Sequence, residues 1–66
     1  MNYFERTECI EEGSPQSLTV EVNQFIFDNS DRITDPKITW THVVFCGHIT
    51  FIAYITFTTF EGAFEQ

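Results

Sequence analysis

The stretch ITWTHVVFCGHITFIAYITFTTF, which runs from Ile38 to Phe60, decides the fold because it contains no Asp, Glu, Lys or Arg. Its apolar residues are mostly β-branched or aromatic, and these residue types are enriched in strands. A long uncharged run must be removed from water by the rest of the chain or by a partner. The stretch therefore predicts β structure, and the charged segments outside it are expected to cover or flank it.

The same stretch is also long enough to cross a bilayer as a helix of about 20 residues. A short single-span membrane protein is therefore an alternative interpretation. Threonines and two histidines place polar atoms along the stretch, and the acidic residues Glu61 and Glu65 follow it where a basic anchor is expected. These features favour strands over a spanning helix, and we expect no membrane association.

The middle of the stretch, Cys46-Gly47-His48, indicates a tight turn, because glycine readily supplies the positive φ angle that such turns need. A two-residue loop, either Cys46-Gly47 or Gly47-His48, would make a C-terminal β-hairpin. Strand alternation then places nine residues on one face, which we expect to be the core. They are Ile38, Trp40, His42, Val44, Ile49, Phe51, Ala53, Ile55 and Phe57.

The opposite face of this hairpin is also unusually apolar. It carries Val43, Phe45, Ile52 and Tyr54 among threonines, so either the same chain or a subunit or partner is expected to cover it. A chain of 66 residues with eight Phe has little room to bury its aromatic side chains alone. We therefore predict a homo-oligomer, a homodimer in the simplest case, with these four residues at the subunit or partner interface.

The segments before the hairpin complete the predicted fold. LTVEVNQFIF, from Leu18 to Phe27, alternates and predicts a strand. The N-terminal segment is either an edge strand or a short helical turn, and the tail after Phe60 is expected to trail off the last strand. The fold class is therefore all-β or mostly β. Residues 1–66 form one small domain, an antiparallel sheet of three or four strands that associates through a second face.

The net charge of −7 and the isoelectric point near 4.3 are the strongest compositional signals. Three basic residues are too few to neutralise several phosphates, which argues against direct nucleic-acid binding. A protein target with a basic surface is favoured instead, although acidity that serves only solubility is the simpler alternative. The predicted partner-binding acidic rim consists of Glu5, Glu8, Glu11, Glu12, Asp28, Asp31 and Asp35.

No residue pattern points to catalysis. His42, Cys46 and His48 lie close in sequence and superficially resemble a zinc site, but a tetrahedral site needs a fourth ligand such as Cys9. A core histidine, a buried thiol and a turn histidine explain the same residues more simply. The aspartates before Pro36 lack the EF-hand pattern. We expect no metal, no cofactor and no enzymatic activity.

A small acidic chain without catalytic groups is typical of non-enzymatic binding proteins that occlude a protein target. The favoured interpretation is an inhibitor of the type that phages carry against a host defence or nucleic-acid enzyme, acting by charge mimicry of nucleic acid. An oligomeric structural or small-ligand-sequestering protein is the alternative. The N-terminus lacks the pattern of a secretory signal. Cys9 and Cys46 could form one disulfide, but a single pair is more typical of two reduced, buried thiols. A cytoplasmic location is therefore expected, in the host cytoplasm if the protein is viral.

Overall fold

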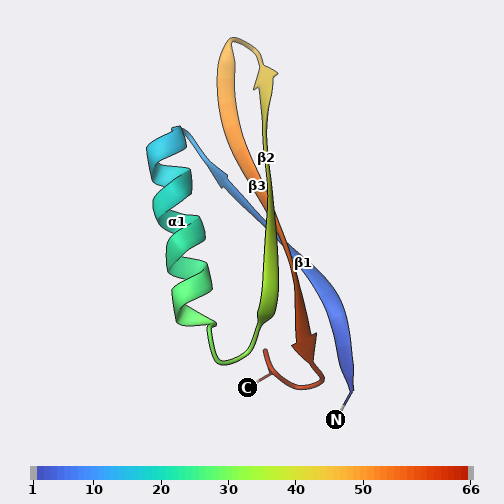
Figure 1. The fold of residues 1–66 in the computed structure, drawn as a ribbon. Helices are drawn as coiled ribbons and strands as arrows, with labels where there is room; N and C mark the ends of the chain where they lie inside the picture. The colour runs from blue at the N-terminus through green and yellow to red at the C-terminus, as the bar shows by residue number, and fades with distance from the viewer. Residues whose placement is uncertain (1, 66) are drawn as a thin grey trace.

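A computed structural model describes residues 2–65 as a three-stranded antiparallel sheet with one helix on one of its faces (Figure 1). The elements follow in the order β1 (Tyr3–Glu12), α1 (Pro15–Asp28), β2 (Thr34–Phe45) and β3 (His48–Phe60). The spatial order of the strands is β1-β3-β2, so the last strand is central. The prediction of a mostly β antiparallel sheet with a C-terminal hairpin is confirmed.

The hairpin of β2 and β3 turns at Cys46 and Gly47. Both residues have positive φ angles, 51° and 78°, which match the tight two-residue turns that suit the twist of antiparallel strands. The register pairs Val44 with Ile49 and Ile38 with Ile55. The predicted division of the hairpin into two faces is therefore confirmed, with Cys46-Gly47 as the loop.

The N-terminal segment is the edge strand β1, so the alternative of a helical turn is excluded. Its register on β3 is regular from Tyr3 opposite Phe60 to Glu12 opposite Phe51. Charged residues along β1 protect this edge from pairing with foreign strands. The order β1-β3-β2 places this charged edge on one side of the sheet and β2 on the other.

The predicted strand over Leu18–Phe27 is wrong, because this segment lies within α1. The Ser14 side chain caps the helix by accepting a hydrogen bond from the Ser17 backbone N–H at 3.1 Å, and a proline stands in the first turn. Leu18 and Val22 are four residues apart and share the buried face of the helix. This helix covers the apolar sheet face that carries Ala53, Ile55 and Phe57.

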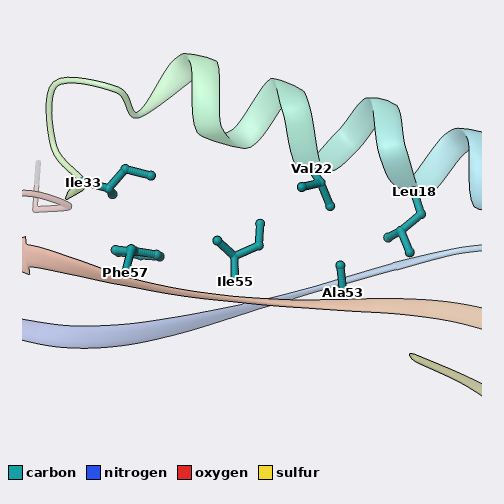
Figure 2. Packing of buried hydrophobic residues seen from close by; sticks show 6 residues of the cluster. All are labelled: Leu18, Val22, Ile33, Ala53, Ile55 and Phe57. Carbon is teal, nitrogen blue, oxygen red and sulfur yellow. The ribbon is translucent and has the colours of Figure 1, made fainter. Parts of the chain in front are cut away.

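The core lies between α1 and the central strand. Leu18 and Val22 point from the helix toward Ala53, Ile55 and Phe57 of β3, and the loop residue Ile33 closes one end (Figure 2). The cluster is narrow, because it is one helix and mainly one strand wide.

The C-terminal tail extends this core, although it was expected to trail off β3. The rings of Phe64 and Phe57 are 5.8 Å apart between centroids. The Arg6 guanidinium lies over the Phe64 ring, 4.8 Å from its centroid. Phe64 therefore fastens the tail to the lower part of the core.

The distal part of the hairpin projects beyond the other elements. The last partner that β1 offers to β3 is Glu12, opposite Phe51, and α1 begins well below the hairpin turn (Figure 1). We call residues 43–50 the hairpin arm. Within residues 2–65 there is no helix long and apolar enough to cross a membrane, and the candidate spanning stretch is this hairpin.

Candidate protein-binding surface

The sheet face opposite the helix is left open. It carries three of the four predicted interface residues at its surface: Val43 is 49% exposed, Phe45 77% and Tyr54 41%. The fourth, Ile52, lies on the same face but is buried, because Glu11 and Thr41 flank it on the two neighbouring strands. The structure therefore brings the predicted set onto one face and removes Ile52 from direct access.

The apolar character of this surface is concentrated in the hairpin arm. On the other side of the arm, Val44 is 63% exposed and Ile49 is 50% exposed. Trp40, three residues before the arm begins, is 52% exposed. These three residues were expected in the core. They are exposed because the helix is too short to cover the whole hairpin. The 14-residue α1 is about 21 Å long, whereas the 13-residue β3 extends for about 40 Å.

An isolated two-stranded hairpin is only marginally stable in water. The arm nevertheless places large apolar side chains on both of its faces, and all its residues except Thr50 are exposed. The length difference between helix and hairpin was the sequence signal that could have revealed this surface, but it required α1 to be identified as a helix first.

The predicted acidic rim is divided between two places. Glu5, Glu8, Glu11 and Glu12 all belong to the edge strand β1. Asp28 ends α1, Asp31 lies in the following loop, and Asp35 lies at the irregular start of β2. The four glutamates thus form a linear array along one edge of the sheet, and we call this array the acidic edge.

Two of the three cationic side chains, Arg6 and Arg32, pair with a carboxylate close to them in sequence. Arg6 lies 3.0 Å from Glu8 and Arg32 lies 3.8 Å from Asp31, both on the surface. Among residues 2–65, no ion pair holds Glu5, Glu11 or Glu12. The acidic edge therefore keeps most of its negative charge free for an external partner.

A shallow hollow on the open face is lined by Glu5, Asp35, Lys37, Phe57 and two threonines, Thr56 and Thr58. Its volume of about 120 Å³ is well below the roughly 300–1,000 Å³ of pockets that hold small organic ligands. The hollow brings Glu5 and Asp35 of the predicted rim near each other across the central strand. It is too small to support a ligand-sequestering function by itself.

The cysteines and histidines do not converge. Cys9 and Cys46 are both exposed, so the expectation of buried thiols is wrong. Cys9 lies opposite Tyr54, about 20 Å along β3 from the turn that holds Cys46, so the two cannot form a disulfide within one chain.

The expectation of a core histidine is also wrong, because His42 is exposed; its ring lies 6.4 Å from that of Phe51. His48 alternates onto the other face of the hairpin, opposite Phe45. The zinc-like sequence spacing is therefore not reproduced in space. Residues 2–65 contain no group of three or more His, Cys, Asp or Glu side chains placed to hold a metal ion.

The chain matches no protein-family model, and comparison with curated proteins and with solved structures gave no significant match.

Proposed function

We propose that this protein is a small non-enzymatic binding protein that occludes a protein target with a basic surface. The observation that carries the proposal is the acidic edge, where four glutamates stand along one exposed strand with a single arginine among them. A complementary charge pattern on the target would speed the encounter and fix its orientation.

The acidic edge suits an extended basic cleft better than a compact pocket. Glu5 and Glu12 are seven residues apart on a strand, which corresponds to about 23 Å. A cleft that holds a nucleic-acid backbone presents basic groups over such a length. The finer form of the proposal is therefore an inhibitor that competes with nucleic acid for its binding site on an enzyme, as a phage protein would do inside a host cell.

The test compares two variants that each lose three carboxylates. The first, Glu5→Gln with Glu11→Gln and Glu12→Gln, neutralises the acidic edge but keeps Glu8, which pairs with Arg6. The control, Glu21→Gln with Asp28→Asn and Asp31→Asn, removes the same charge from the helix and its following loop. Net charge is equal in the two variants, so a difference in binding reports position.

Immobilised wild-type chain and both variants are used to capture proteins from an extract, and each captured protein is purified for binding and competition assays. We expect a target whose dissociation constant rises at least tenfold with the edge variant and less than threefold with the control. Duplex DNA or RNA should compete with the chain for that target. Equal weakening by both variants, or binding that ignores salt, would overturn the acidic edge as the recognition element.

A further inference from the structure

The two free edges of the sheet differ sharply. Edge strand β1 carries five charged residues, whereas β2 carries none from Ile38 to Phe45 and has no proline there. A long, uncharged edge strand rich in β-branched and aromatic residues is a template for pairing with another strand. This edge lies on the opposite side of the sheet from the acidic edge.

We propose that two copies of the chain pair antiparallel through β2, with Thr41 of each copy at the two-fold axis. The result is a continuous six-stranded sheet in which the acidic edges lie at the two outer ends. This dimer differs from one that packs sheet face against sheet face. It does not depend on the proposed function.

The backbone of β2 determines which residues can pair. In a two-residue hairpin the residues that flank the loop, here Phe45 and His48, form a hydrogen-bonded pair, and bonded and non-bonded pairs then alternate. Every second residue therefore directs its N–H and C=O groups to the free edge. These residues are Ile38, Trp40, His42 and Val44.

Antiparallel pairing about Thr41 gives hydrogen-bond partners to the outward backbone N–H and C=O groups of all four residues. Ile38 then lies opposite Val44 of the second copy, and Trp40 opposite His42. Moving the axis to Trp40 places Val44 opposite Pro36, which has no N–H and lies in the irregular part of β2. Moving it to His42 places Ile38 opposite Cys46 in the turn. The register about Thr41 is the one that uses the regular part of the strand completely.

The extent of the three-stranded part of the sheet indicates that the partner at the free edge of β2 is a second copy of the chain. Up to His42, β2 belongs to a three-stranded part of the sheet. His42 pairs with Phe51 of β3, and Phe51 in turn pairs with Glu12, the end of β1 nearest the hairpin turn. Beyond that point the arm stands alone. Pairing about Thr41 lays the unsupported residues 43–45 of each copy beside residues 37–39 of the other. Each chain therefore supplies what the other lacks, which an unrelated partner has no reason to match.

The exposed apolar surface of β2 and its lack of charge are both compatible with pairing to a second copy of the chain. Trp40, Val43, Val44 and Phe45 are 52%, 49%, 63% and 77% exposed. Together they expose on the order of 400–500 Å², given roughly 150–250 Å² per aromatic side chain. Edge pairing covers part of this area, because each side chain stands roughly perpendicular to the sheet and meets those of the neighbouring strand, and it also covers the paired backbone. Two copies with a charge of −7 each can meet here because Ile38–Phe60 contains no charged residue.

The decisive test is a cross-link at the axis. Opposed residues of a non-hydrogen-bonded pair have Cα atoms about 4.5 Å apart, within disulfide range. In a background with Cys9→Ser and Cys46→Asn, Thr41→Cys should form a disulfide dimer under mild oxidation. Thr39→Cys and Val43→Cys are the controls. They lie on the same face of β2 but about 13 Å from their symmetry copies, so neither should cross-link.

Solution mass provides the second measurement. Light scattering at about 100 μM should give twice the 7.7 kDa chain mass for the wild type. Thr41→Lys opposes two ammonium groups at the axis and should give a monomer, whereas Thr39→Lys, which faces Val43 of the other copy, should leave the dimer at least tenfold tighter than Thr41→Lys. A wild-type monomer, or cross-linking at position 39 or 43 in preference to 41, overturns the proposal.

Discussion

At the scale of single residues, Thr59 shows how one side chain fastens the fold. It is 1% exposed, and its hydroxyl donates a hydrogen bond to the Arg32 carbonyl at 2.7 Å. This bond ties the loop after α1 to the end of the central strand. A buried hydroxyl is tolerated there because it is satisfied.

Replacing Thr59 by Val tests this bond, because Val keeps the side-chain shape but leaves the Arg32 carbonyl without its donor. We expect the free energy of unfolding to fall by about 1–3 kcal/mol, measured by urea titration. Thr59→Ser is the control: it keeps the donor and loses a methyl group, at a cost of about 1 kcal/mol. A Val variant more stable than the Ser variant would contradict this role.

The turn residues make opposite demands on substitution. Gly47 has φ of 78° and nothing within 4 Å of the position of an added Cβ, so Gly47→Ala is opposed by backbone conformation and not by space. We expect Gly47→Ala to lower the free energy of unfolding by about 1–2 kcal/mol. In a domain of this size that lowers the melting temperature by roughly 4–8 °C per kcal/mol.

Cys46 at φ of 51° already occupies the left-handed region, where Asn is better tolerated. The free energy of unfolding of Cys46→Asn should therefore lie within about 0.5 kcal/mol of the wild-type value or exceed it. Thermal unfolding of the two turn variants side by side checks both expectations. A Gly47→Ala variant as stable as Cys46→Asn would show that the turn adopts another conformation.

At the scale of elements, the hairpin could be predicted from sequence and the helix could not. The uncharged, β-branched stretch and the glycine at its middle predicted both strands, a two-residue loop at one of two positions, and the division of their faces. Over Leu18–Phe27 two periodicities coexist, because Leu18, Val20 and Val22 fit a strand while Leu18, Val22 and Phe25 fit a helix. The Ser14-Pro15 cap favoured the helix, but it resembles a turn when read alone.

The candidate surface was predictable in part for the same reason. Alternation alone placed Val43, Phe45 and Tyr54 on the second face, and the structure exposes them there. The exposure of Trp40, Val44 and Ile49 depends on the length of a helix that the sequence pattern did not reveal. Tertiary cover, unlike alternation, is not a local property of the chain.

A matched pair of substitutions distinguishes the two periodicities in α1. Val22 is fully buried and Val20 is 62% exposed, although a strand would place both on one face. Val22→Ala should lower the free energy of unfolding by about 1.5–3 kcal/mol. Val20→Ala should change it by less than about 0.5 kcal/mol, because Ala is the better helix former. Urea titration with circular dichroism measures both, and equal losses would favour a strand.

At the scale of the whole molecule, charge and apolar surface are segregated. The molecule is elongated, 46 Å by 22 Å by 18 Å, and the uncharged hairpin arm forms one end of its long dimension (Figure 1). All ten acidic residues lie outside Ile38–Phe60. Segregation lets one small sheet offer a charged edge and a neutral edge to different partners.

The same segregation sets how stability responds to salt. A net charge of −7 on 66 residues implies self-repulsion. Within residues 2–65, salt would also weaken two surface ion pairs, Arg6–Glu8 and Arg32–Asp31, each worth at most about 1 kcal/mol. Raising NaCl from about 20 mM to about 200 mM shortens the Debye length and should raise the free energy of unfolding by roughly 0.5–1 kcal/mol.

The source of that gain can be located with charge variants at one protein concentration, which holds any self-association fixed. Glu11→Gln with Glu12→Gln removes two adjacent carboxylates of the acidic edge, so this variant should start more stable at low salt and gain less on adding NaCl. Glu8→Gln removes a carboxylate that already pairs with Arg6, and it should change the salt response little. If stability instead fell with salt in the wild type, attraction within the chain would outweigh repulsion. The acidic edge would then be compensated internally and would offer little free charge to a target.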